Sequence, residues 1–302
     1  MEFIMMCGLP GSGKTSWAHE TGYKVISSDS IREELYGDES IQGDAQKVFE
    51  ILHSRVKESL KNGESCVYDA TNLNWRLRRN FLNEIGGIKC KKTCVLMADT
   101  FAECYDYNTQ RERKVPISVM RRMYHNFCFP STMEGFDEVK LVWGNFMNDS
   151  QLSYFYDLDK EIERYKNYDQ CNRHHSLTLG QHLEKCANIL KDSHADCNLV
   201  MAGLLHDIGK PEVRTFMNAR YQPTEEAHYY GHNNVSSYEA MFFLKKKGVN
   251  DEDIKDVCNL VFWHMQLYFI EKEKTKNRYL KFWGEDFYNR VYALHKADME
   301  AH

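Results

Sequence analysis

The chain has 302 residues, enough for two domains, and its hydrophobic content of 42% and aromatic content of 13% can build folded cores. The absence of a long apolar run excludes a bilayer-spanning helix. A formal net charge of −5 argues against bulk attraction to nucleic acid but allows a local basic groove. Ten cysteines without a Cys-x-x-Cys pair indicate reduced thiols in the cytoplasm. The start of the chain runs directly into a glycine-rich loop, so we expect no signal peptide.

The first predicted element is a buried strand over residues 3–7, which leads into the sequence GLPGSGKT at residues 8–15. This sequence fits the phosphate-loop pattern G-x-x-x-x-G-K-[ST] completely. Its glycines allow successive backbone N–H groups to point at phosphate oxygens, Lys14 adds a charge near the β- and γ-phosphates, and the Thr15 hydroxyl can ligate Mg²⁺. The predicted nucleoside-triphosphate site consists of Gly8, Gly11, Ser12, Gly13, Lys14 and Thr15.

Further strands are predicted over residues 23–27, 65–68 and 93–98, with a helix over residues 45–60. Strands that alternate with helices after a phosphate loop predict an α/β domain, whose ligands bind at the carboxyl ends of a parallel sheet. Asp29 and Asp69 each follow a strand, so both carboxylates are expected near the phosphates. Asp29 with Arg32 suits a base beside an anion clamp, and the alternative is that Asp29 only caps the next helix.

Two arginine-rich stretches follow, DATNLNWRLRR at residues 69–79 and RERKVPISVMRRMY at residues 111–124. Together with GLPGSGKT and SSDSIR, they resemble the kinase domain of phage-type polynucleotide 5′-kinases over residues 3–126. The resemblance implies that Lys14 and Thr15 hold ATP and Mg²⁺, and that Asp29 is the general base for an acceptor 5′-hydroxyl. It also implies that Arg32 grips the acceptor's own phosphate, and that Arg111 or Arg113 is the arginine of a lid over the phosphates.

The second half of the chain differs in composition, because ten of the 13 histidines follow residue 170. We predict a kinase domain over residues 1–150, a linker over residues 151–168 and an all-α domain over residues 169–302, since apolar residues recur there at helical spacing. Candidate metal ligands in this half are His182, His206, Asp207, His232, His264 and Asp298. Imidazole and carboxylate together suit Mn²⁺, Fe²⁺, Ni²⁺, Co²⁺ or Zn²⁺ better than Mg²⁺ alone.

This half resembles the HD-domain phosphohydrolases, and among them the module attached to bacterial tRNA nucleotidyltransferases, through NRHHSLTLGQH, LLHDIGKP, YYGHNN, FWHM and LHKADMEA. The resemblance implies a primary metal site made by His182, His206, Asp207 and Asp298. His232 and His264 would complete a second metal site, and Lys210 would steady the phosphate. Asp298 is four residues before His302, so a short closing helix is expected.

Kinase-plus-HD fusions are known among bacterial end-healing enzymes, which this pair of domains resembles. The resemblance implies a 5′-hydroxyl polynucleotide kinase joined to a phosphoesterase for 2′,3′-cyclic phosphate or 3′-phosphate ends of RNA or DNA, with a ligase acting downstream and no membrane partner. One alternative is a small-molecule or nucleoside kinase fused to an HD nucleotide phosphohydrolase, which the arginine-rich stretches disfavour. Another is a kinase with a non-catalytic tRNA-binding HD module, which the near-complete His/Asp set disfavours.

Overall fold

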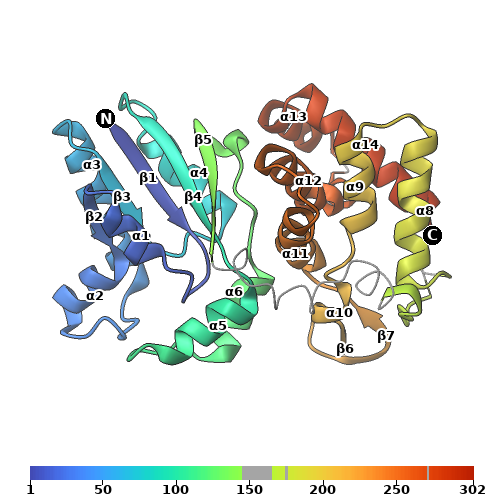
Figure 1. Ribbon diagram of the computed structural model, residues 1–302, viewed down its shortest axis with the longest axis horizontal. Coiled ribbons are helices and arrows are strands. Elements are labelled where there is room, and N and C mark those ends of the chain that lie inside the picture. The colour runs from blue at the N-terminus through green and yellow to red at the C-terminus, as the bar shows by residue number, and fades with distance from the viewer. Residues whose placement is uncertain (145–164, 174–175, 271) are drawn as a thin grey trace. The chain divides into compact units, whose positions relative to one another are not determined.

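The computed structural model describes residues 1–144, 165–173, 176–270 and 272–302 (Figure 1). The chain divides into two compact units: the first comprises residues 1–124 and 130–148, and the second residues 125–129 and 149–302. The predicted linker over residues 151–168 lies for the most part outside the described residues, so the domain boundaries stay a prediction. In the described part of the chain, no helix combines the length and the apolar character needed to cross a membrane.

The first unit contains a five-stranded sheet with the strand order β2-β3-β1-β4-β5 (Figure 1). The strands are β1 (Glu2–Cys7), β2 (Lys24–Ser27), β3 (Cys66–Asp69), β4 (Lys91–Ala98) and β5 (Glu138–Trp143). Every neighbouring pair is parallel, which confirms the predicted α/β fold. Apolar runs predict four of these strands but not β5, whose sequence EVKLVW mixes charged and apolar residues and is mostly only partly buried.

Helices connect the strands of the first unit. They are α1 (Lys14–Glu20), α2 (Ser28–Tyr36), α3 (Ala45–Lys61), α4 (Trp75–Glu84), α5 (Phe101–Gln110) and α6 (Ile117–His125), with a short 3-10 helix η1 (Thr132–Glu134). The central strand β1 is buried from Phe3 to Cys7, as expected for a parallel strand that is covered on both faces. Phe81 of α4 packs against this strand, with its ring centre 5.7 Å from that of Phe3.

The carboxyl ends of the parallel strands meet at one edge of the sheet, and polar residues gather there. The loop of residues 8–13 follows β1, α2 follows β2, β3 ends at Asp69, and Asp99 comes directly after β4. This is the edge at which open α/β sheets bind their ligands.

The second unit is predominantly helical, which confirms the predicted fold class. Its elements are α8 (Leu179–Asp192), α9 (Cys197–Leu205), α10 (Lys210–Val213), β6 (Thr215–Met217), β7 (Pro223–His228), α11 (His232–Lys246), α12 (Asp251–Trp263), the 3-10 helix η4 (His264–Phe269), α13 (Glu273–Trp283) and α14 (Glu285–Glu300). The antiparallel hairpin of β6 and β7 is an addition that helical periodicity does not predict.

Helix α14 closes the second unit and packs against both α8 and α9. It has 16 residues, so the expectation of a short closing helix is wrong. The helix extends from Asp298 towards the amino terminus as far as Glu285, and Val291, Leu294 and Ala297 are its buried apolar residues. Asp298 therefore lies in the last turn of a helix whose carboxyl-terminal half is held by packing from Val291 to Ala297.

Candidate phosphate loop and candidate metal centre

The phosphate loop has a backbone that requires glycine. Gly11 and Gly13 have φ values of 87° and 75°, a region that residues with a side chain rarely adopt. A Cβ atom on Gly11 would lie 2.1 Å from the carbonyl oxygen of Cys104, so the loop also packs too tightly there for any side chain. Gly13 is the N-cap of α1, and the first backbone N–H groups of this helix are therefore open to a ligand.

Lys14 and Thr15 begin α1 and take part in separate contacts. Lys14 is buried, and its Nζ donates to the carbonyl oxygen of Leu9 (2.6 Å) and to Oγ of Ser12 (3.3 Å). Burial lowers the pKa of Lys14, although the nearby carboxylate of Asp69 opposes this change. The Thr15 hydroxyl donates to Oδ2 of Asp69 (2.8 Å), which places two oxygen ligands of the kind that Mg²⁺ prefers side by side.

Two buried carboxylates lie at the ends of the central strands. Burial raises the pKa of Asp69, whereas the Thr15 hydrogen bond and the charge of Lys14 lower it. Burial also raises the pKa of Asp99 to about 6, and the charge of Glu103 acts in the same direction. Asp99 is absent from the predicted site residues, although it follows β4 just as Asp29 follows β2. The rule that strand-following carboxylates face the ligand would have found it.

Asp29 lies in the first turn of α2, close to two arginines. The N-cap of α2 is Ser27, whose hydroxyl accepts from the backbone N–H of Asp29 (3.2 Å), so the alternative that Asp29 is the cap is wrong. The guanidinium of Arg32 donates to Oδ1 of Asp29 (2.7 Å), and that of Arg113 lies 3.3 Å from the same oxygen. Arg32 is buried, and its Nε has no hydrogen-bond partner among the described residues. One donor of Arg32 is therefore unsatisfied within the described part of the chain.

The segment between α5 and α6 contains both candidate lid arginines. The side-chain amide of Asn108 donates to and accepts from the backbone of Val115, with both distances at 2.9 Å, and so closes the loop that contains Arg111 and Arg113. Arg113 reaches Asp29, whereas the charge of Arg111 adds to the burial that lowers the pKa of Lys14. The two arginines therefore act on different predicted site residues.

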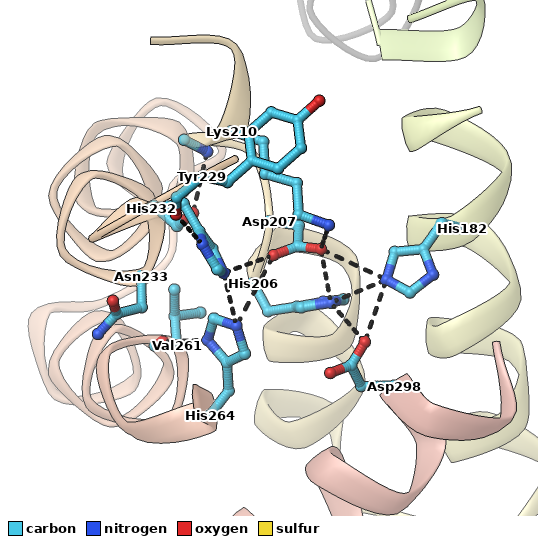
Figure 2. Close-up of polar contacts among 12 residues, drawn as sticks. His182, His206, Asp207, Lys210, Tyr229, His232, Asn233, Val261, His264 and Asp298 are labelled. Carbon is cyan, nitrogen blue, oxygen red and sulfur yellow. Dashed lines mark hydrogen bonds and ion pairs between the residues drawn. The ribbon is translucent and has the colours of Figure 1, made fainter. Parts of the chain in front are cut away.

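Six buried His and Asp side chains converge in the second unit (Figure 2). They come from the first turn of α8 (His182), the turn directly after α9 (His206 and Asp207), the first residues of α11 and η4 (His232 and His264), and the last turn of α14 (Asp298). One group of possible ligands comprises His182, His206, Asp207 and Asp298, and the other Asp207, His232 and His264. In each group the ligand atoms lie within 4.8 Å of one another.

Asp207 belongs to both groups and faces each with a different oxygen (Figure 2). Its Oδ2 lies 3.4 Å from Nε2 of His182 and 3.4 Å from Nε2 of His206. Its Oδ1 lies 3.0 Å from Nε2 of His232 and 3.7 Å from Nε2 of His264. Asp298 faces only the first group, with Oδ1 3.2 Å from His182 and 3.4 Å from His206. Asp207 therefore offers one oxygen to each group of possible ligands.

The donor set fits divalent metal ions. His206, His232 and His264 each donate their Nδ1–H to a backbone carbonyl, those of Gly203, Tyr229 and Val261, at 2.7–2.8 Å. In the neutral rings the Nε2 lone pairs therefore point inward, where those of His232 and His264 face each other at 3.2 Å. Lone pairs that face each other at this distance repel. Two ligands that each lie about 2.1 Å from one ion are about 3.0–3.4 Å apart, so a shared cation would fit between these two nitrogens.

The electrostatics of the cluster favour the ionised form of its carboxylates, which is the form that binds a metal ion. Burial on its own would raise the pKa of Asp207, but Lys210, His206 and His232 hold it well below its usual range. Burial also lowers the pKa of His264 to about 3, which keeps this imidazole neutral and able to bind metal. Lys210 lies 2.6 Å from Oδ2 of Asp207, and its Nζ also donates to Oε1 of Gln170 (2.8 Å). The predicted phosphate-steadying lysine thus reaches the centre directly.

Tyr268, which belongs to η4, is not among the site residues predicted from the sequence. Its hydroxyl donates to Oδ2 of Asp298 (2.9 Å), the oxygen that does not face His182 and His206. The ring also packs edge-on against His295, with centres 4.4 Å apart. No spacing rule could have found this contact, because Tyr268 lies in an aromatic-rich segment and Asp298 is 30 residues away.

Two family models match the chain, one in each half. Residues 3–130 match the AAA domain family AAA_33, and residues 173–299 match the HD domain family. The first matched range contains the phosphate loop, Asp29, Arg32 and both candidate lid arginines, and the second contains all six candidate metal ligands. The chain thus joins an N-terminal kinase-like domain with a phosphate loop to a C-terminal HD domain.

Solved structures resemble parts of the chain only distantly. A chain of the Pnkp1/Rnl/Hen1 RNA repair complex is 17% identical with a TM-score of 0.38, and the match covers 41% of this chain and 43% of that one. A gluconokinase from Sinorhizobium meliloti 1021 is 18% identical with a TM-score of 0.35, and the match covers 47% of this chain and 82% of that one. This chain thus spans less than half of the matched repair-complex chain, and similarity at this level supports no functional conclusion.

Proposed function

We propose that the protein is a bifunctional enzyme that heals the ends of broken RNA. One unit would transfer the γ-phosphate of ATP to a 5′-hydroxyl, and the other would remove a 2′,3′-cyclic phosphate or a 3′-phosphate. The observation that supports this proposal is that one chain contains two groups of residues suited to opposite phosphate chemistries. The first is a phosphate loop with a nearby carboxylate and arginines, and the second is a six-ligand metal centre with a lysine.

The contacts around Asp29 support transfer to a hydroxyl acceptor. A carboxylate that is 39% exposed can accept the proton of an incoming hydroxyl, whereas the two arginines beside it can hold phosphate groups. We assign Asp29 as the general base, Arg32 as the clamp on the acceptor's own phosphate, and Arg113 and Arg111 as lid arginines. Lys14 and Thr15 would hold ATP and Mg²⁺, with Asp69 supporting the Mg²⁺ site through Thr15.

The metal centre supports hydrolysis of a phosphate ester. We assign His182, His206, Asp207 and Asp298 as ligands of one ion and Asp207, His232 and His264 as ligands of a second. The ions, which we propose to be Mn²⁺, Ni²⁺, Co²⁺, Fe²⁺ or Zn²⁺, would lower the pKa of water and polarise the phosphoryl group. Lys210, held against Asp207, would bind a phosphate oxygen and offset its charge.

The choice of RNA as substrate rests on chemistry and on the resemblance described above. A 2′,3′-cyclic phosphate requires a ribose 2′-hydroxyl, and RNA breaks of this type leave a 5′-hydroxyl on the other end. One enzyme that treats both ends prepares them for a ligase. The ten cysteines form no Cys-x-x-Cys pair, which supports a cytoplasmic location for this repair.

The test is to incubate the full chain with ATP, Mg²⁺, Mn²⁺ and an RNA that has 5′-hydroxyl and 2′,3′-cyclic phosphate ends. Mapping both product ends then reports on each unit in one reaction. We expect a new 5′-phosphate and loss of the cyclic phosphate. A DNA strand of the same sequence with 5′-hydroxyl and 3′-phosphate ends measures the preference for RNA.

Three outcomes would contradict the proposal in different ways. Phosphorylation of free nucleosides or small metabolites, without phosphorylation of RNA, would favour the small-molecule kinase alternative. An unchanged 3′ end in a protein that binds tRNA would favour the non-catalytic HD module. Cleavage of free nucleotides alone would make the second unit a nucleotide phosphohydrolase.

A further inference from the structure

The candidate metal centre forms the floor of a pocket that is larger than a phosphate group requires. The pocket has a volume of about 420 Å³, and Asp207, Lys210, His232 and Asp298 line its floor. Two segments form its walls: residues 227–233, between β7 and α11, and residues of η4. A phosphate group alone would fill only a small part of this volume, since pockets of about 300–1,000 Å³ hold ligands the size of a nucleotide or a drug.

Both walls present aromatic rings to the solvent. Tyr230 is 52% exposed and Phe269 is 68% exposed, although large apolar rings are usually buried. The ring of His228 stacks on that of Tyr230, with centres 5.4 Å apart and planes only 7° apart. Tyr230 therefore has a supported orientation even though more than half of its surface is accessible.

Hydrogen bonds tie each aromatic wall to a metal ligand. The carbonyl oxygen of Tyr229, next to Tyr230, accepts from Nδ1 of His232 (2.7 Å) and from its backbone N–H (3.2 Å). On the other wall, Tyr268 precedes Phe269 and donates its hydroxyl to Asp298 (2.9 Å). The distance between the aromatic rims and the metal ligands is therefore set by short, direct connections.

We propose that this pocket binds the nucleobase of the terminal nucleotide whose phosphate is held on the metal centre, with Tyr230 and Phe269 as the stacking residues. The inference rests on the proposed phosphoesterase function and names the substrate class of its site as nucleoside-linked phosphates. Aromatic rings stack on any base, so the pocket would select for the presence of a base and not for its identity. The same pocket floor supplies Lys210 and the ions for the phosphate, which places the two halves of one nucleotide in one pocket.

The experiment compares two ligands that differ only in the base: adenosine 3′-phosphate and 1-O-methylribose 3-phosphate. Both are measured with the full-length Lys14→Ala protein, so that the phosphate loop does not contribute. KM and kcat for hydrolysis are measured with Mn²⁺, and Kd is measured by calorimetry on EDTA-treated protein, whose fold is checked by circular dichroism. We expect KM and Kd for adenosine 3′-phosphate to be lower than those for 1-O-methylribose 3-phosphate by about tenfold or more.

The double variant Tyr230→Ala/Phe269→Ala should bring the ratio of the two ligands' KM values, and that of their Kd values, close to one. The variant Tyr230→Phe, which keeps the stacking face, should retain the ratio. Tyr221→Ala is the matched control, because Tyr221 is 87% exposed in the β6–β7 turn and does not line the pocket. It should behave as the parent protein does.

Failure of this inference and failure of the proposed function give different results. If both ligands are hydrolysed with equal KM and bound with equal Kd, the base pocket is refuted and the phosphoesterase stands. An unchanged ratio in the double variant also refutes it. If neither ligand is hydrolysed, the 3′-phosphatase part of the proposed function fails, and the ratio of the Kd values still decides whether the base is bound.

Discussion

The two candidate sites of this chain are built in opposite ways. The phosphate loop uses eight consecutive residues, and much of its binding capacity lies in backbone N–H groups at the start of one helix. The candidate metal centre uses six side chains spread from residue 182 to residue 298, which come from four helical segments and the turn after a fifth. A backbone site tolerates most side-chain changes that leave its shape intact. A site made of side chains loses a ligand with each substitution.

The difference predicts where each unit is vulnerable. In the first unit, a few candidate residues lie on or beside a loop whose backbone the glycines define. In the second, Asp207 contacts both ligand groups, so its carboxylate has no substitute. Variants at these positions should therefore separate the two activities, and the size of each effect should follow the number of ligand contacts that are lost.

The largest effect is expected for Asp207→Ala, which removes a ligand from both groups. We expect phosphoesterase activity to fall by about a thousandfold or more and both ions to be lost, while 5′-kinase activity on the same RNA persists. Metal content and both activities are measured on one preparation. Asp192→Ala, at an exposed carboxylate of α8, is the control and should change none of the three. Retention of full phosphoesterase activity by Asp207→Ala would remove the centre from the mechanism.

Lys14→Ala should produce the reverse pattern. Loss of the charge that the loop presents to the β- and γ-phosphates should lower 5′-phosphorylation by about a thousandfold, with phosphoesterase activity within about twofold of the parent. End-labelling of RNA measures the first and release of phosphate the second. If both activities fall together in a folded variant, the two sites are not independent, and the comparison between them breaks down.

Asp29→Ala sharpens the comparison inside the kinase unit. A general base contributes about 10²–10⁴-fold, so kcat for phosphorylation should fall by about this factor while ATP affinity is retained.

Arg32→Ala should slow phosphorylation of acceptors that contain their own phosphate far more than phosphorylation of plain nucleosides. Equal losses with both acceptors would take Arg32 out of the acceptor site.

Tyr268→Phe tests whether the metal centre depends on residues that do not touch an ion. The hydroxyl orients Asp298 through Oδ2, and partners of this type are worth about 10–100-fold in metal affinity. We expect the Kd for Mn²⁺ at the ligand group that contains Asp298 to rise by about tenfold. The thermal stability of the EDTA-treated protein should change little. Tyr292→Phe, at a tyrosine of α14 that is 54% exposed, is the control. A Kd that stays the same would make Tyr268 a packing residue only.

The smallest effect concerns Asp99, which has no counterpart in the metal centre. Burial raises its pKa to about 6, above the value of about 3.9 expected in the unfolded chain, so the folded protein binds this proton more tightly. Ionisation of Asp99 therefore costs stability as pH rises through this window, and the cost is constant above it. Asp99→Asn should raise the free energy of unfolding by about 1–3 kcal/mol at pH 8 and by less at pH 5. Urea denaturation at the two pH values measures this difference, and an equal gain at both would contradict the assignment.

The sequence predicts the first unit well because its signals are local. A phosphate loop is a run of adjacent residues, and four of the five strands are short apolar runs that parallel burial requires. The strand β5 escapes prediction because its partly buried sequence contains Glu138 and Lys140. The capping role of Ser27 at α2 also escaped, since Ser27 and Asp29 are both good caps and only the backbone geometry decides between them.

For the second unit, the sequence by itself determined the residue types and a helical fold, because histidine and aspartate are conspicuous in apolar helices and the helical period is local. Only the tertiary structure decided that Asp207 presents one oxygen to each ligand group, that Tyr268 holds Asp298, and that Tyr230 and Phe269 rim the same pocket. These relations join residues that are tens of positions apart in the chain. They depend on how α8, α9, α11, α12 and α14 pack, and packing angles come from the fit of many side chains, which no spacing rule contains.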